Sequence, residues 1–147
     1  MKWLIAQVAW VGPMLGQHNH FLLHISERES YAATRYREQA ERVYHVLNGR
    51  LKDRAYLAGE NYSIADIATY HWSGYAGIQG FDWNDFPALS EWRYRVSERP
   101  AVKRAKDVYD QLMAAAAEDS PRNQEDFNRF FARKTGPKAS FEAFLKE

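Results

Sequence analysis

The feature of this sequence that most restricts its fold is a row of apolar residues between positions 31 and 53. These residues are Tyr36, Ala40, Val43, Leu47 and Leu51. They follow one another at steps of four, three, four and four residues, which places them on one face of an α-helix. No segment of the chain shows the sustained alternation expected of a half-buried strand. The sequence therefore predicts an all-α fold.

Helical spacing recurs on both sides of this segment. A first helix is predicted to begin near Trp3 and to bend or stop near Gly12-Pro13, because proline lacks a backbone donor. Capping residues and prolines then delimit three further helices, at 63–79, 87–99 and 100–117. We expect a bundle of about five helices over residues 1–117, of the kind found in the domain named below. Residues 118–147 are predicted to be a C-terminal extension, with a short helix at 123–134, a turn at 136–137 and a last helical piece.

Composition excludes several classes of protein. The 147 residues are enough for one domain with a substantial core. Lysine and arginine number 20 against 19 acidic residues, and no basic cluster indicates a nucleic-acid partner. The absence of cysteine excludes disulfides, thiolate catalysis and cysteine-bound zinc. Gln7 and the Gly12-Pro13 break interrupt the apolar start, so neither a signal peptide nor a membrane span is predicted. We expect a cytoplasmic protein without a membrane partner.

The segment around Ser63 contains a capping box. The Ser63 hydroxyl can accept a hydrogen bond from the amide three residues on, and the Asp66 carboxylate can accept one from the Ser63 amide. These bonds satisfy two donors that a helix start leaves unpaired. Asp66 is therefore interpreted as a structural residue and not a catalytic one. Replacing it with alanine is expected to cost roughly 0.5–2 kcal/mol.

Several segments together resemble a known family. Leu57-Ala58-Gly59-Glu60-Asn61-Tyr62-Ser63-Ile64-Ala65-Asp66-Ile67-Ala68 is similar to the conserved capping segment in the C-terminal domain of glutathione transferases. Val11-Gly12-Pro13-Met14-Leu15-Gly16-Gln17-His18-Asn19-His20-Phe21 resembles the glycine-proline-methionine stretch of the bacterial nu class, relatives of the prion-forming nitrogen regulator. The resemblance continues through the matches at 31–36, 44–48, Trp92 and 99–102. It covers roughly residues 2–110, and the C-terminal extension lies outside it.

The resemblance implies where glutathione would bind. Most glutathione contacts in the family come from a thioredoxin-like N-terminal domain, which the sequence is expected to lack because no part of it reads as strand-helix-strand. One contact is implied here, since Arg35 and Tyr36 match an arginine-tyrosine pair that binds glutathione. A guanidinium suits a carboxylate well. The alternative is that Arg35 only pairs with a helix neighbour such as Glu38. Lys2 stands where the family has a glutamine that contacts glutathione, which is a departure from the pattern.

Four further residues are candidates for the lining of a pocket: Trp3, Trp10, Gln17 and His20. For the tryptophans the alternative is a place in the core, because aromatic residues at helical spacing are more often core. His18, His20 and His24 could in principle hold a metal ion, but no carboxylate has a comparable spacing. We therefore expect a polar cluster lining a cleft, with glutathione as substrate and no metal.

The expected function follows from the resemblance. A protein of this family would carry out glutathione-dependent conjugation or disulfide reduction when its helical domain is joined to a thioredoxin-like domain. Alone, the helical domain is expected to have weak or no activity, because the groups that activate the thiol lie on the other domain. The alternatives are a non-catalytic helical module for protein interactions and an enzyme whose site is completed across a dimer. The expected partners are a second copy, through residues 2–24 and 31–53, or a thioredoxin-like domain.

Overall fold

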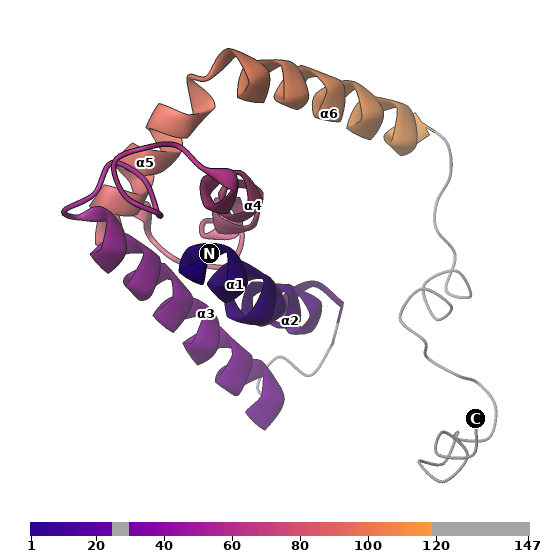
Figure 1. Cartoon of the computed structure of the whole chain (residues 1–147). Helices are drawn as coiled ribbons and strands as arrows, with labels where there is room; N and C mark the ends of the chain where they lie inside the picture. The colour runs from indigo at the N-terminus through magenta and orange to yellow at the C-terminus, as the bar shows by residue number, and fades with distance from the viewer. Residues whose placement is uncertain (25–29, 119–147) are drawn as a thin grey trace, which may run out of the picture. The chain divides into compact units, whose positions relative to one another are not determined.

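The structure is a computed structural model that describes residues 1–24 and 30–118 (Figure 1). Within them the elements are α1 (Lys2–Ala6), the π-helical turn η1 (Gln7–Val11), α2 (Gly12–His24), α3 (Tyr31–Leu51), α4 (Ile64–Trp72), the 3-10 turns η2 (Ser73–Tyr75) and η3 (Trp83–Asp85), α5 (Pro87–Ser97) and α6 (Pro100–Glu118). Because α1, η1 and α2 follow one another without a gap, these residues form five helical segments and no strand. The predicted all-α fold is confirmed.

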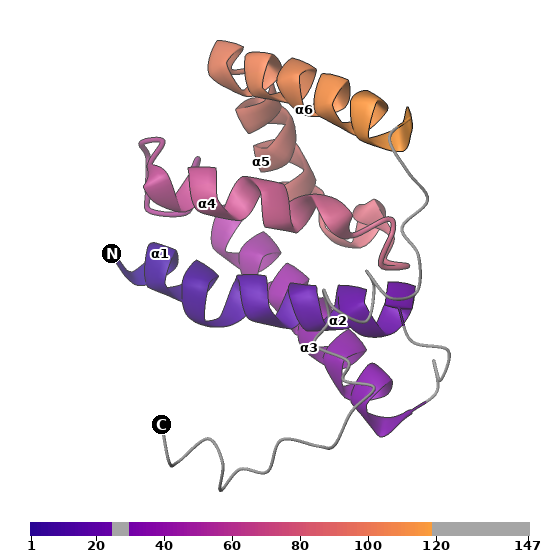
Figure 2. The same ribbon diagram turned by 90° about the vertical axis from the view of Figure 1, so that its right-hand side faces the viewer.

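The chain divides into two compact units, Met1–Arg104 and Ala105–Glu147. In the first unit α2 packs along α3, α3 packs against α5, and α1 lies beside α4 (Figure 2). The predicted domain boundary at residues 117 and 118 stays a prediction. The helix expected at 123–134 and the turn after it lie outside the described residues. Among the described helices, none has the length and apolar character needed to cross a membrane.

The core forms around the inner face of α3. Ala40, Val43, Leu47 and Leu51 are buried there, as their spacing predicted, while Tyr36 is half-buried. The largest side chains that are almost completely enclosed come from other elements as well: Trp92, Tyr44, Phe86, Leu15, Leu47, Leu57 and Leu89. Burying each such aliphatic or aromatic side chain contributes about 1.5–3 kcal/mol to folding. The α3 stripe is therefore the surface on which the other helices assemble.

The first helical segment continues through Pro13 with a π-helical turn just before it, so of the two predicted outcomes, a bend or a stop, the stop is wrong. Residues 7–11 adopt a π-helical turn in which the Gly12 amide donates to the Gln7 carbonyl. This wider turn precedes a proline that has no N–H to donate. At least one carbonyl of the preceding turn, at Val8 or Ala9, consequently has no intrahelical donor. The third helix also differs from its prediction, because α4 ends at Trp72 and is followed by a 3-10 turn.

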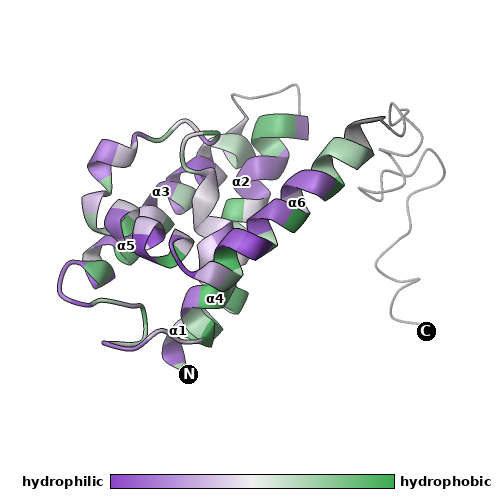
Figure 3. Ribbon diagram, turned by 90° about the horizontal axis from the view of Figure 1, so that it is seen from above, coloured by the Kyte–Doolittle hydropathy of each residue, from purple (hydrophilic) through white to green (hydrophobic). Residues whose placement is uncertain are grey.

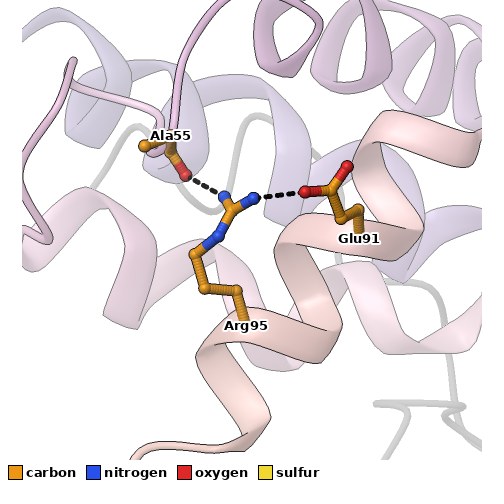
Figure 4. Close-up of polar contacts among 3 residues, drawn as sticks. All are labelled: Ala55, Glu91 and Arg95. Carbon is orange, nitrogen blue, oxygen red and sulfur yellow. Dashed lines mark hydrogen bonds and ion pairs between the residues drawn. The ribbon is translucent and has the colours of Figure 1, made fainter.

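Asn48 and Arg95 make two of the contacts that attach α5 to the rest of the first unit. The Asn48 side-chain oxygen on α3 accepts from the Leu89 amide at 3.1 Å, which satisfies one of the unpaired donors at the start of α5. Arg95 donates from Nη1 to the Ala55 carbonyl at 2.7 Å and from Nη2 to Glu91 Oε1 at 2.6 Å (Figure 4). Arg95 thus fixes the connection after α3 against the outer face of α5.

The capping segment extends well beyond the helix start. Ser63 Oγ accepts from the Ala65 amide at 3.3 Å, and Asp66 Oδ2 accepts from the Ser63 amide at 2.9 Å and from Ser63 Oγ at 2.8 Å. Asp66 Oδ1 accepts from the Leu57 amide and from Trp92 Nε1, both at 2.9 Å. The Asp66 side chain has no exposed surface. One carboxylate therefore joins the start of α4, the preceding loop and α5.

Candidate functional site

The described residues form a groove between the first helical segment and the end of α4. It has a volume of about 430 Å³. We call it the Trp72 groove, and it is lined by Gln7, Val8, Gly12, Pro13, Gly16, Gln17 and Trp72. Gly12 and Gly16 are four residues apart on α2, so they share a helix face on which no side chain stands. A Cβ atom at Gly16 would lie only 3.4 Å from the Trp72 ring. The two glycines therefore let the indole approach the helix backbone.

A second hollow, of about 340 Å³, lies at the starts of α1 and α4. We call it the Arg50 hollow, and it is lined by Met1, Lys2, Trp3, Leu4, Arg50, Ala58, Ser63, Ile64 and Ala65. Arg50 Nε donates to the Leu57 carbonyl at 2.9 Å, and its guanidinium lies 5.4 Å from the Trp3 ring centroid. Among the described residues Arg50 has no carboxylate partner.

Apolar side chains are exposed on the same two elements. Ile5 and Val8 expose 57% and 66% of their surface on α1 and η1, and Ile64 and Ile67 expose 64% and 58% on α4. Because α1 and η1 pack beside α4, these four residues lie on neighbouring elements (Figures 2 and 3). We call this surface, with its two hollows, the α1–α4 face. Contiguous exposed apolar area is typical of a surface that another molecule covers.

The residues that match the glutathione-binding pair lie apart from both hollows. Arg35 is exposed on α3, and within the described residues its guanidinium forms no ion pair. The structure does not show the alternative, a local ion pair between Arg35 and a helix neighbour such as Glu38. The ion pair on this part of α3 joins Arg37 and Glu41 instead, at 3.9 Å. Tyr36 is half-buried and stacks on Phe21 of α2, with ring centroids 5.5 Å apart. Arg35 is thus free to meet an acidic group from outside this chain.

The four candidate lining residues are found in different places. Gln17 lines the Trp72 groove, and Trp3 lines the Arg50 hollow. Trp10 is packed against the hydrophobic core and lines neither hollow. His20 contacts the rings of Phe21 and His24, at 5.5 and 5.9 Å between centroids. The described part of the chain contains no group of three potential metal ligands.

Sequence reasoning missed three residues of these hollows: Gln7, Arg50 and Trp72. Gln7 carried a weak signal, since it is a polar residue six positions before Pro13, next to the turn from which the proline removes a donor. The Gly12 and Gly16 spacing was a second signal for a close approach of another element. No local sequence pattern indicated that Trp72 lines a groove, because the position of Trp72 over α2 depends on how α4 packs.

A buried polar network joins α2 to α3 through Gln79. The Tyr44 hydroxyl donates to Gln79 Oε1 at 2.8 Å, and Gln79 Nε2 donates to Asn19 Oδ1 at 2.6 Å and to the Leu15 carbonyl at 3.3 Å. Burial raises the pKa of Tyr44, so its hydroxyl stays protonated and acts as a donor. The network holds α2 in place with its glycine face turned toward Trp72.

His18 is the titratable group of this buried layer. Its ring Nε2 lies 3.4 Å from the Gln79 carbonyl, and its Nδ1 is buried without a hydrogen-bond partner among the described residues. Burial lowers the pKa of His18 from its usual value of 6.5, and the charge of Arg37 lowers it further. The imidazole is therefore neutral at pH 7 and is a structural group.

Arg93 closes the C-terminal end of α4. Its Nη1 donates to the Tyr70 carbonyl and, at 2.8 Å, to Ser73 Oγ. The guanidinium also lies 4.5 Å from the centroid of the Tyr70 ring. Burial lowers the pKa of Arg93, but two acceptors and an aromatic face stabilise its charge. This side chain supports Trp72 by fixing the helix end that carries it.

Comparison with known proteins identifies the family to which this architecture belongs. Residues 3–100 match the model of the glutathione S-transferase C-terminal domain. The disulfide-bond oxidoreductase YfcG of Escherichia coli is 44% identical over 105 residues, which make up 71% of this chain and 49% of YfcG. Its relative YghU from the same organism is 32% identical over 116 residues, 74% of this chain and 40% of YghU. The chain thus spans about half the length of these relatives.

Solved structures agree with the sequence match. The glutathione transferase URE2P8 of Phanerochaete chrysosporium, determined with oxidized glutathione, superposes with a TM-score of 0.69 at 35% identity, over 77% of this chain and 52% of that one. A Burkholderia graminis glutathione transferase with two glutathione molecules bound per subunit gives a TM-score of 0.64 at 33% identity, over 70% and 46% of the two chains. The fold, the capping network and these matches show that the chain belongs to the glutathione S-transferase family, of which residues 3–100 form the C-terminal domain.

Proposed function

We propose that this chain supplies the helical half of a glutathione-dependent enzyme, which conjugates electrophiles or reduces disulfides when a thioredoxin-like domain is joined to it. The relatives that it matches over about half their length include two disulfide-bond oxidoreductases. The similar solved structures contain glutathione or oxidized glutathione. In this proposal glutathione is a substrate, and no metal takes part. The nu class remains the nearest subtype that the Val11–Phe21 segment indicates.

The α1–α4 face is the observation that carries the proposal. Four aliphatic side chains, Ile5, Val8, Ile64 and Ile67, expose more than half of their surface there. The same face contains the Trp72 groove and the Arg50 hollow. A thioredoxin-like domain packed on it would cover this apolar area and enclose the two hollows. A cleft formed in this way between two domains is a common place for a small-molecule site.

Arg35 is the residue that we assign to glutathione, together with Tyr36. Its guanidinium is exposed and unpaired within the described residues, so no internal ion pair has to be broken before it binds a carboxylate. Tyr36 is stacked on Phe21, which supports this part of α3. A carboxylate contact of this kind stabilises the ground state and the transition state alike, so it contributes binding and little rate. The chain alone is therefore expected to bind glutathione weakly and to conjugate at the background rate.

A homodimer through residues 2–24 and 31–53 is part of the proposal. Leu23 and Tyr31, at the ends of these helices, expose 55% and 80% of their surface. Two-fold dimers are the commonest closed assembly of soluble proteins. A cytoplasmic location fits the proposed chemistry, because glutathione is the thiol of reducing compartments.

The second candidate function is a non-catalytic helical interaction module. It is favoured by the α1–α4 face itself, since exposed apolar area can receive any complementary protein. The two candidates differ in what they require of Arg35. An interaction module does not need to bind glutathione. The enzyme half needs Arg35 to contact a carboxylate group of glutathione.

Calorimetric titration of glutathione into the purified chain separates the two candidates. The enzyme half predicts weak binding that the Arg35→Ala variant abolishes. Arg42→Ala is the matched control, because Arg42 is also exposed on α3 and has no ion pair among the described residues. Equal binding by both variants would exclude the assigned contact. Adding the other half of YfcG as a separate polypeptide should restore turnover above background, and a failure of both tests would leave the interaction module.

A further inference from the structure

On the α1–α4 face, Gln7 is a polar side chain whose burial is not compensated by a hydrogen bond within the described residues. It is only 8% exposed, yet its amide forms no hydrogen bond with any described residue. A buried amide without a partner is costly, by about as much as a lost hydrogen bond. The amide nevertheless lines the Trp72 groove, and it is not among the fully enclosed unsatisfied atoms of the described chain. Its polar atoms therefore keep some access to solvent where the side chain lines the groove, and Nε2 lies next to Gly12.

A second hydrogen-bonding group lies in the same turn. Because Pro13 has no N–H, a carbonyl at Val8 or Ala9 lacks its intrahelical donor. Val8 and Pro13 both line the Trp72 groove. The groove thus offers the Gln7 amide, with two donors and one acceptor, next to the turn that contains this carbonyl.

The remaining lining limits what can bind. No residue that lines the groove carries a charge: it consists of two glutamines, two glycines, valine, proline and tryptophan. A charged ligand would lose its hydration there without gaining an opposite charge. Val8, which is 66% exposed, and the Trp72 ring supply apolar walls. The groove therefore fits a neutral ligand that presents a donor and an acceptor side by side next to an apolar group.

We propose that the Trp72 groove binds the main chain of one extended residue of a polypeptide partner, with the Gln7 amide paired to that residue's own N–H and C=O and an adjacent apolar side chain against Trp72. In an extended chain the N–H and the C=O of one residue point to the same side, so a primary amide can pair with both through two hydrogen bonds. A free carboxylate would use only the donors of Gln7, and an ammonium only its acceptor. The inference rests on the proposed function only in taking that partner to be the thioredoxin-like domain.

The test uses the full chain and N-acetyl-L-phenylalaninamide, which carries two amide groups and one apolar ring. This probe is titrated while the side-chain amide resonances of Gln7 and the indole resonance of Trp72 are followed by NMR. We expect both to shift with one dissociation constant on the order of 1 mM, as is usual for a ligand of this size. 3-Phenylpropan-1-ol, which has the ring without the amides, should bind about tenfold more weakly or not at all.

Gln7→Met is the decisive variant, because methionine has nearly the same shape and helix propensity but no hydrogen-bonding groups. This variant should weaken binding of the probe by roughly tenfold. Its melting temperature should be unchanged or raised, since an amide without a partner is removed. Gln39→Met on α3, outside the groove, is the control and should change neither. Gly16→Ala, which places a methyl group against Trp72, should also weaken binding of the probe, although Gln7 is unchanged in this variant.

Two results would overturn the proposal. One is a Gln7→Met variant that is less stable but binds the probe as before, which would make Gln7 a structural residue. The other is a set of Gln7 and Trp72 shifts produced by glutathione and not by the neutral amide, which would mean that an anionic ligand occupies the groove. Neither result depends on Arg35, so the proposed function can fail or hold separately.

Discussion

Replacing Asp66 with alanine should destabilise this fold far more than the loss of a helix cap. The carboxylate is fully buried and accepts hydrogen bonds from four donors, which come from Ser63, Leu57 and Trp92. The hydroxyl donor of Ser63 can turn toward another acceptor, but the Leu57 amide and Trp92 Nε1 are fixed by the packing around them. The alanine variant would leave these two donors buried without an acceptor.

The expected magnitude follows from these contacts. Each buried donor without an acceptor costs about 1–3 kcal/mol, and the lost cap costs about 1 kcal/mol. We therefore expect Asp66→Ala to lower the free energy of unfolding by about 3–7 kcal/mol, out of the 5–15 kcal/mol that is typical of a domain. Because the capping box alone would account for only about 0.5–2 kcal/mol, the difference measures what Leu57 and Trp92 add.

Urea unfolding followed by circular dichroism is a direct assay. A loss of this size corresponds to a fall of roughly 2 M in the midpoint of unfolding. Asp66→Asn should be nearly as damaging, because its NH₂ group would face donors. Asp53→Ala, at an exposed position after α3, is the control and should stay within about 0.5 kcal/mol of the parent. A loss below about 1 kcal/mol for Asp66→Ala would refute the reasoning that the carboxylate joins three elements.

Three further predictions concern the same unit. Because burial lowers the pKa of His18, the unfolded chain binds more protons there, so stability should fall as the pH drops below about 6.5. Unfolding curves at several pH values should show this loss, and His18→Phe should reduce it. Arg93→Met should cost about 1.5–3 kcal/mol in thermal unfolding, since the Tyr70 carbonyl and ring lose their cation. Gly49→Ala should stabilise α3 by about 0.5–1 kcal/mol, because a Cβ atom there meets nothing within 4 Å, and an unchanged midpoint would contradict this.

The sequence alone determined the helices and their limits to a large extent. The stripe from Tyr36 to Leu51 predicted α3 within two residues of its observed end, because apolar spacing of this regularity suits only one helix face. The capping box at Ser63 predicted the start of α4, since the bonds that form it lie within four residues of the chain. Both signals are local, and a single sequence contains them completely.

The sequence left open how the chain accommodates Pro13, and the reason is physical. A missing N–H can be accommodated either by ending a helix or by widening one turn, and the local residues do not decide between the two. The packing of α2 along α3 favours continuation, because Leu15 and His18 are buried only if the helix goes on. The π-helical turn Gln7–Val11 accompanies this continuation, and it begins at Gln7.

Apart from Gln17 and Trp3, the lining of the two hollows could not be predicted from the sequence, because the hollows exist only between elements. Gln7 and Trp72 are separated by 65 positions, and they meet because α4 packs beside η1 and the glycine face of α2. Asp66 likewise acquired its donors from Leu57 and Trp92 through packing, not through spacing. Hydrogen-bond partners and exposed area are properties of the folded surface. A sequence states which groups are present, and only the tertiary structure decides which of them are left without a partner.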